Sequence, residues 1–291
     1  MNDFSNIITL PLSAMEHGEG PVWDDETQLM YWVDLMKGLW YQYNPATEEF
    51  KVQDCKQPVG VVSINKSHGF LYGLANGFAT SDSMNTLPEN VWPLDTSVNK
   101  VRFNDGATSP HGIFYAGTML YDGSAPVGSL YRINRDLQVE VMDTDLFVPN
   151  GMGWSLDSNT FYMVDSGQHC IFSYDYDAKF GDLSNRKVFK QFADDENPDG
   201  MCIDAEGNFW VAMWEGWRIE VLNPTGECVN KVEMPVSHPT SCCFGGKNFE
   251  DLYITTSQIA LSDYQKAEQP LAGNTLLIKN AGNGRPEPKF G

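Results

Sequence analysis

Short hydrophobic runs, separated by polar turn residues, follow one another along this chain. They come in pairs, and the second run of each pair carries a large aromatic residue. Units of forty-odd residues with several short strands are typical of β-propeller blades, and no segment shows the 3.6-residue amphipathic period of helical repeats. The pattern therefore predicts an all-β, six-bladed β-propeller. The aromatic residues recur at intervals of 41, 43, 47, 48 and 43 residues: Tyr31, Tyr72, Tyr115, Tyr162, Trp210 and Tyr253.

Each repeat is expected to form a blade of four antiparallel strands. The β-prone run Ile7–Leu12 is expected to be the outer strand of the last blade, where it closes the ring and removes free sheet edges. We expect one domain over residues 1–291, a helical turn near Asp263–Glu268, and a loop at Leu120–Gly128 that is long enough to form a lid. The first strand of each repeat starts about 11 to 13 residues before the aromatic residue, at Glu19-Gly20, Val59-Gly60, Asn104-Asp105-Gly106, Asn150-Gly151, Asp199-Gly200 and Thr240-Ser241.

The charge of the chain narrows the classes of ligand. A formal net charge of −20 and a pI near 4.4 argue against binding to nucleic acid or to an anionic membrane surface. The same charge favours cations, although most of the acidic surplus is expected to serve only solubility. A hydrophobic fraction of 42% is enough to fill a sizeable core.

The sequence carries no targeting signal that we recognise. Residues 1–8 lack the basic region and apolar run of a signal peptide, and no stretch approaches the ~18 uninterrupted apolar residues of a membrane span. The six cysteines contain no CxxC pair, which favours reduced thiols. We expect a cytoplasmic protein, present as a monomer or a weak dimer.

Acidic or amide side chains stand at the start of four first strands. Because the innermost strand of each blade lines the central channel, equivalent positions of a closed ring converge around its axis. A single Asn-Gly or Asp-Gly pair is a common turn dipeptide. When such pairs stand in register around a ring, their carboxylates crowd together and repel one another, and a bound cation would reduce that repulsion. Carboxylate and amide oxygens are hard donors. They fit a Ca²⁺, Mg²⁺ or Mn²⁺ site better than they fit a zinc site of the soft-ligand type. The converging residues are Glu19, Asn104 with Asp105, Asn150 and Asp199.

Six short motifs stand in one order along nearly the whole chain: Glu19-Gly-Pro-Val-Trp, Arg102-Phe-Asn-Asp-Gly, Ala116-Gly-Thr-Met, Pro149-Asn-Gly, Pro198-Asp-Gly-Met and Pro239-Thr-Ser-Cys-Cys-Phe-Gly-Gly. In these motifs the chain resembles the senescence marker protein/regucalcin, gluconolactonase and luciferin-regenerating-enzyme family of six-bladed propellers. Any one motif is weak, but together they are specific. The resemblance implies a single divalent metal held by Glu19, Asn150 and Asp199, and it implies hydrolysis of sugar lactones to aldonic acids.

The resemblance also implies how the substrate is bound. Arg102 and Asn104 are expected to hold substrate hydroxyls or the outer shell of the metal, and Asp105 and Met119 are assigned to substrate binding with them. We expect the metal to polarise the lactone carbonyl and to activate a bound water, with Asp199 as general base. The chain departs from the family pattern at Ser109–Tyr115, where the usual Asp and Arg are replaced by Ser109 and Ile113; this change is expected to affect a turn more than the metal.

Alternatives remain open at this stage. The same metal site suits a phosphotriesterase, and the fold also suits a non-catalytic calcium-binding propeller. Calcium is the expected ion, while Zn²⁺, Mg²⁺, Mn²⁺ and Fe²⁺ fit the oxygen donors at some affinity. The residues name neither the lactone nor its ring size.

Two histidines and two tryptophans lie near the strand starts. His17 and His238 are interpreted as ordinary hydrogen-bonded loop histidines that flank the same mouth. Trp214 and Trp217 are candidates for a pocket wall, but packing between blades is the favoured interpretation.

Overall fold

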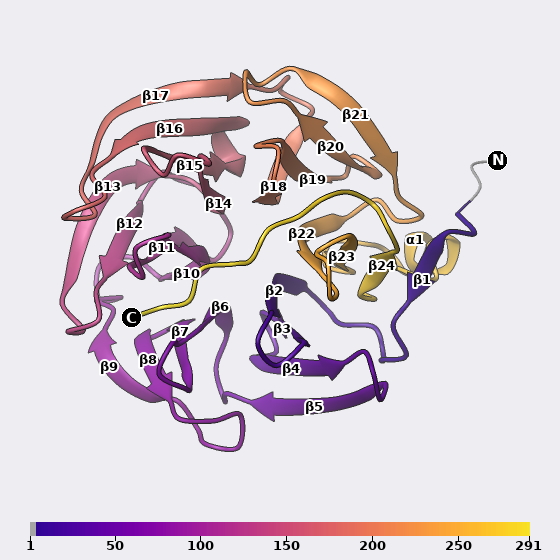
Figure 1. Ribbon diagram of the computed structural model, residues 1–291, viewed down its shortest axis with the longest axis horizontal. Coiled ribbons are helices and arrows are strands. Elements are labelled where there is room, and N and C mark those ends of the chain that lie inside the picture. Colours follow the sequence, from indigo (N-terminus) through magenta and orange to yellow (C-terminus); the bar gives the residue numbers. More distant parts are fainter. Residues whose placement is uncertain (1–3) are drawn as a thin grey trace.

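Six four-stranded antiparallel sheets stand in a ring in a computed structural model that describes residues 4–291 (Figure 1). Four consecutive strands make each of the first five blades, and the predicted propeller is therefore confirmed. The strands of blades one to three are β2 (Gly18–Asp24), β3 (Leu29–Asp34), β4 (Leu39–Asn44), β5 (Glu49–Asp54), β6 (Val59–Ile64), β7 (Phe70–Leu74), β8 (Gly77–Ser81), β9 (Glu89–Pro93), β10 (Val101–Thr108), β11 (Phe114–Leu120), β12 (Gly128–Ile133) and β13 (Val139–Leu146).

The last blade joins the two parts of the chain that lie furthest apart in sequence. Strand β1 (Ile7–Thr9) pairs antiparallel with β24 (Leu276–Ile278), so the predicted closure by the N-terminal strand is confirmed. The expected helical turn is α1 (Asp263–Glu268), which begins at a capping box on Ser262. The remaining elements are β14 (Pro149–Trp154), β15 (Thr160–Asp165), η1 (Ser166–Gln168), β16 (Cys170–Tyr176), β17 (Leu183–Gln191), β18 (Asn197–Ile203), β19 (Phe209–Trp214), β20 (Arg218–Leu222), β21 (Cys228–Glu233), β22 (Pro239–Gly245) and β23 (Asp251–Thr256).

Aromatic residues fill the wedges between blades. Between blades one and two, Trp40 packs edge-on against Phe70 and Tyr72, and Trp40 and Tyr72 are fully buried. Of the six repeated aromatic residues only Tyr162 is half-buried, and the others are buried. Such large rings fill a gap that widens away from the axis, which explains why each repeat carries one. The six cysteines are free thiols, as predicted.

Every innermost strand has a β-bulge close to its start. The pairing register shifts between Glu19 and Val22 in β2, and the other five innermost strands shift at the equivalent place. A bulge redirects the side chains around it. The Asn-Gly and Asp-Gly pairs of β14 and β18 therefore lie in bulged strands and not in turns.

Glycine follows the bulged residue because neighbouring strands approach closely there. A Cβ on Gly151 would lie 2.6 Å from the backbone nitrogen of Met201 and 2.8 Å from the carbonyl oxygen of Asp199. Backbone atoms cannot give way as a flexible side chain can, so a larger residue would push β14 and β18 apart. These close contacts hold the starts of the innermost strands together.

The residues that follow the last strand cross the ring (Figure 1, yellow). Phe290 N–H donates to Ile64 O (2.8 Å) at the end of β6, and Gly291 N–H donates to Gly112 O (3.0 Å) in the turn between β10 and β11. Lys289 is 2.7 Å from a carboxylate oxygen of Asp24, where β2 ends. This C-terminal segment, residues 279–291, therefore lies on the face opposite the strand starts. No helix within residues 4–291 is long and apolar enough to cross a membrane.

Candidate metal centre

Asn150 and Asp199 meet at the starts of two neighbouring innermost strands. Asn150 lies on β14 and Asp199 on β18, and the amide Nδ2 of Asn150 donates a hydrogen bond to Oδ1 of Asp199. The same nitrogen also donates to Ser166 Oγ at 3.2 Å, and Asn150 Oδ1 accepts one bond, from Gly151 N–H at 3.2 Å. An amide oxygen has two lone pairs, so one remains for a ligand.

Glu19 adds a second buried carboxylate to this group. Its side chain accepts a hydrogen bond from Gly20 N–H (3.1 Å), and it has no ion-pair partner within residues 4–291. Burial, and then the negative charges of Asp199 and Asp105, raise the pKa of Glu19 well above its ordinary value. Burial and the charge of Asp105 likewise raise the pKa of Asp199. Within residues 4–291 these carboxylates form no ion pair, although the charge of Arg102 opposes part of the shift of Glu19.

Arg102 lies on the neighbouring blade and bonds to Asn104 instead of to a carboxylate. Its Nη1 donates to Asn104 Oδ1 (2.8 Å) and to Phe103 O (3.1 Å), and Asn104 Nδ2 donates to Pro149 O (3.1 Å). The side chain is 5% exposed, and its Nε has no hydrogen-bond partner. Burial lowers the pKa of Arg102 to about 10, so the guanidinium stays charged at neutral pH. A buried donor without a partner is a group that a bound ligand would satisfy.

The loop that was expected to form a lid places an aromatic ring on Arg102. The guanidinium carbon lies 5.7 Å from the ring centre of Tyr121, a cation–π contact. Tyr121 is 43% exposed, so the ring covers Arg102 from the solvent side. Met119 pairs with Arg102 across β10 and β11 and is buried. Arg102, Asn104 and Met119 therefore occupy one side of the group of strand starts.

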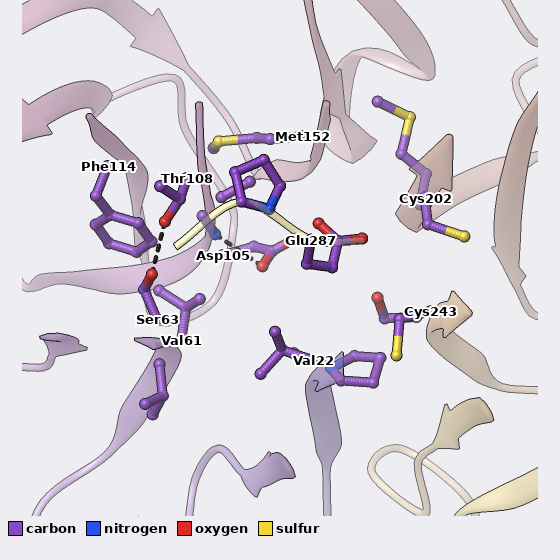
Figure 2. Close-up of a pocket in the computed structure, with 18 of the residues that line it drawn as sticks. Val22, Val61, Ser63, Asp105, Thr108, Phe114, Met152, Cys202, Cys243 and Glu287 are labelled. Atoms are coloured by element: carbon purple, nitrogen blue, oxygen red, sulfur yellow. Dashed lines mark hydrogen bonds between the residues drawn. The ribbon is translucent and has the colours of Figure 1, made fainter. Parts of the chain in front are cut away.

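Asp105 faces a different part of the channel from the other candidates. It accepts a hydrogen bond from Gly106 N–H (2.7 Å) and lines a cavity of about 70 Å³ that all six innermost strands help to form. Figure 2 shows Asp105 between Glu287 and a hydrogen-bonded pair of hydroxyls, Ser63 and Thr108 (2.6 Å). Burial raises the pKa of Asp105 to about 6. The position of Asp105 thus differs from that of Arg102, with which it shares a motif.

Glu287 is a further buried acidic residue, and no motif in the sequence predicts its place at the channel. It belongs to the C-terminal segment, which carries no repeat position, and it projects into the cavity that the segment closes (Figure 2). Burial raises the pKa of its carboxyl group, while the charge of Arg285 opposes the shift. The flanking Pro286 and Pro288 predict only an extended segment, and nothing in the sequence indicates where that segment lies.

His17, Trp214 and His238 come from three blades and contact one another. The rings of Trp214 and His238 are stacked, with centroids 4.0 Å apart and an interplanar angle of 6°. His17 stands edge-on to Trp214 at 5.8 Å, and its Nδ1 is bonded to Ser257 Oγ (2.9 Å). The interpretation as an ordinary hydrogen-bonded histidine holds for His17 but not for His238, whose buried Nδ1 has no partner. Trp217, the other tryptophan considered for a pocket wall, is 42% exposed.

The stretch that departs from the family pattern lies away from these residues. Ser109 is buried in the turn between β10 and β11, and its Oγ accepts hydrogen bonds from His111 N–H (3.3 Å) and Ile113 N–H (3.1 Å). The turn meets Gly291 on the face that the C-terminal segment crosses. The change from Asp to Ser109 therefore affects a turn on the opposite face, as expected.

The donor set of Glu19, Asn150 and Asp199 suits a hard divalent cation. Within residues 4–291, no three side chains drawn from His, Cys, Asp and Glu lie close enough together to hold a metal ion. The predicted centre differs from such a group because one of its three members is an amide. Two buried carboxylates and one amide oxygen are donors that Ca²⁺ and Mg²⁺ prefer, and a cation there would offset the electrostatic cost of burying both carboxylates.

Comparison with known proteins gives a consistent result. Residues 17–258 match the family model described as the SMP-30/Gluconolactonase/LRE-like region. Regucalcin of Danio rerio is 36% identical over 271 residues, which cover 92% of this chain and 92% of the relative. A luciferin-regenerating enzyme superposes with a TM-score of 0.90 at 28% identity, covering 98% of both chains. A calcium-binding regucalcin of Agrobacterium tumefaciens, at 24% identity and 97% and 96% coverage, shares the fold with a TM-score of 0.93.

The family model spans most of the chain, and its ends coincide with features of the fold. It begins at His17, directly before β2, and it ends at Gln258, two residues after β23. Together with the identity to regucalcin over nine-tenths of both sequences, this match shows that the chain belongs to the SMP-30/gluconolactonase/LRE-like family.

Proposed function

We propose that this protein is a metal-dependent hydrolase that opens sugar lactones. The observation that carries the proposal is the pairing of two features at one end of the channel. Glu19 and Asp199 are buried carboxylates that form no ion pair within residues 4–291, and Arg102 is a buried guanidinium whose Nε lacks a hydrogen bond. The first feature suits a metal cation and the second suits a polar ligand beside it, whereas a packing role explains neither.

Glu19, Asn150 and Asp199 would hold the cation. When bound, a divalent ion supplies Lewis-acid chemistry, in which it polarises a carbonyl group and lowers the pKa of water at the site. Calcium is the ion that we propose, because the donors are oxygens and regucalcin of Agrobacterium tumefaciens is described as calcium-binding. Mg²⁺, Mn²⁺, Zn²⁺ and Fe²⁺ are alternatives that metal replacement distinguishes.

The chain's own residues would bind the substrate and move the proton. Asp199 is the proposed general base: burial makes its carboxylate more basic than that of an exposed Asp, and Asn150 Nδ2 holds one of its oxygens in place. Arg102, held by Asn104, would donate to substrate hydroxyls through its free Nε. Met119 would contact the substrate from the same side. Tyr121 would limit access of water to Arg102.

The test is hydrolysis of a panel of aldonolactones by metal-stripped protein, with single divalent ions added back. Activity should return with one ion and should be absent from Asp199→Ala. A phosphotriester in the same panel tests the alternative hydrolase. A protein that binds the ion tightly but opens no lactone would refute the proposed activity, and it would favour the calcium-binding role that the name of the bacterial regucalcin describes.

Two further expectations belong to this proposal. We place the protein in the cytoplasm, since its six cysteines are free thiols, and we propose that the chain forms one domain and acts as a monomer or a weak dimer. Fractionation of cells and sedimentation of the pure protein measure these two properties directly.

A further inference from the structure

One side of the group of strand starts is formed by His17, Trp214 and His238. His17 immediately precedes β2 and lies two residues from Glu19, and His238 immediately precedes β22. Trp214 ends β19 and pairs with Asn197 at the start of β18, the strand that carries Asp199. The hydroxyl of Thr240 in β22 donates to Gly18 O in β2 (2.6 Å), so the strand starts that follow His238 and His17 are in contact. We call these three side chains the imidazole–indole wall.

The hydrogen bonds of His17 define which of its nitrogens carries the proton. The Oγ of Ser257 donates to Glu16 O (3.1 Å) and accepts from Ile259 N–H (3.0 Å). Its only proton is therefore in use, and the contact with His17 Nδ1 (2.9 Å) must have the imidazole as donor. The Nε2 of neutral His17 then carries a lone pair, and no partner for it exists within residues 4–291.

His238 also has a nitrogen without a partner. The residue is 3% exposed, and its Nδ1 is buried with no hydrogen bond. Its Nε2 lies 4.0 Å from a carboxylate oxygen of Glu215, on the exposed side. A buried polar atom without a partner costs about 1–3 kcal/mol, so its presence beside a candidate ligand site points to a ligand that completes the bond.

His238 is uncharged at neutral pH, because burial lowers its pKa to about 4. Its neutral imidazole offers one hydrogen-bond donor and one acceptor and attracts no anion. The indole of Trp214 lies flat against one imidazole and edge-on to the other, which fixes the rings in place.

We propose that the imidazole–indole wall selects lactones whose ring carries several hydroxyl groups, by exchanging hydrogen bonds with those hydroxyls. This proposal rests on the proposed lactone hydrolysis and names the residues that set its substrate class. A ring that carries hydroxyls would offer partners to His238 Nδ1 and Arg102 Nε, which are buried without a hydrogen bond. An unsubstituted aliphatic lactone leaves them unpaired, and sites built to bind a hydroxyl discriminate strongly against analogues that lack it.

The competing explanation is that the wall only packs blades five, six and one together. Packing and recognition differ in what they predict for two substrates of the same ring size. Loss of packing affects both substrates alike. Loss of recognition affects only the hydroxylated one, and mainly through KM, since a hydrogen bond to a remote hydroxyl is made in both the bound ground state and the transition state.

The experiment compares D-glucono-1,5-lactone with δ-valerolactone in the calcium-loaded protein. His238→Leu keeps the bulk of the side chain and removes the nitrogen, and His238→Gln restores a polar group. His111→Leu, at an exposed histidine on the other face, is the matched control. For His238→Leu we expect kcat/KM on gluconolactone to fall about 10- to 100-fold through KM. We expect the rate on valerolactone to stay within about twofold, with partial recovery in His238→Gln.

Binding of gluconate and of valerate, measured by calorimetry, separates this proposal from the proposed activity. If the wild type opens neither lactone but binds gluconate, and if His238→Leu weakens that binding, the proposed activity is refuted and the role of the wall is supported. Equal losses on both lactones, or no change in His238→Leu, overturn the wall while leaving the activity intact. A wild type that neither opens gluconolactone nor binds gluconate overturns the wall as well. Melting curves of each variant exclude misfolding as the cause of a loss.

Discussion

Replacement of Asp105 by Asn should stabilise the metal-free protein, and the gain should depend on pH. Asp105 is 7% exposed, and it accepts one hydrogen bond, from Gly106 N–H. Asn keeps the size and the accepting oxygen of the side chain but cannot ionise. The substitution therefore removes only the cost of holding a buried negative charge near Glu19 and Asp199.

The size of the gain follows from the pKa of Asp105. Burial raises this pKa from 3.8 to about 6 in the folded protein, and tenfold in a protonation constant corresponds to about 1.4 kcal/mol. Below pH 4 the carboxyl is protonated in both the folded and the unfolded state, so Asp and Asn should be equivalent. Between pH 4 and 6 only the unfolded state loses the proton, and the wild type loses stability. Above pH 6 the difference should level off at about 3 kcal/mol.

The assay is chemical or thermal unfolding in the presence of a chelator, from pH 4.5 to 8. For a chain of 291 residues, about 3 kcal/mol corresponds to a rise of about 5 °C in Tm. Glu268→Gln, which removes one exposed charge from α1, is the control for net charge and should change stability by less than about 0.5 kcal/mol. A gain that is the same at pH 4.5 and pH 8, or a loss at pH 8, would refute the reasoning.

Three further predictions concern the bulges, the C-terminal segment and the cation. In a urea titration, Gly151→Ala should destabilise the fold by about 2–3 kcal/mol, because the new Cβ meets the backbone of Met201, and the variant should also bind calcium more weakly. In Gly153→Ala the new Cβ meets only the side chain of Ile203, so the loss of stability should be less than half as large. Lys289→Met should cost about 1 kcal/mol at pH 7, after allowance for solvent screening. Burial alone would raise the pKa of Asp24, but hydrogen bonds from Lys289 and Thr27 outweigh burial and lower the pKa. The stability lost in Lys289→Met should therefore shrink as the pH falls below about 4. A stability loss that stays constant down to pH 2 would argue against this ion pair. Calcium at 100 times its Kd should raise the unfolding free energy of the wild type by about 2.7 kcal/mol, and calorimetry with Asp199→Asn should show no such rise.

The repeat pattern was sufficient for the fold because each blade repeats the same physical requirement. An aromatic residue in the second strand must fill the wedge next to its neighbour, and Tyr72, Tyr115 and Tyr253 are fully buried for that reason. The helical turn expected near Asp263–Glu268 is found at those residues. Outer strands such as β17 could not be given bounds, because exposed polar residues such as those of Leu183–Gln191 carry little hydrophobic periodicity.

The candidate site was predictable only in part. Equivalent positions in a ring converge, so the meeting of Asn150 with Asp199 followed from the repeat. A bulge points the side chains of neighbouring residues in different directions, which the repeat alone does not predict. For that reason Asp105 lines the cavity that Glu287 also lines. Asn104, one residue earlier, is instead hydrogen-bonded to Arg102. Glu287 lies outside any repeat. The stack of Trp214 on His238 depends on how blades five and six are placed in space, which sequence spacing does not encode.

The most direct test of the metal centre is the number of calcium ions bound per chain, measured by equilibrium dialysis and metal analysis. Wild type, Glu19→Gln, Asn150→Leu, Asp199→Asn and Asp105→Asn would be dialysed side by side at one free calcium concentration. We predict one ion per chain for the wild type and for Asp105→Asn, and none for the other three variants. An ion that persists in Asp199→Asn, or one that is lost only in Asp105→Asn, would contradict the account.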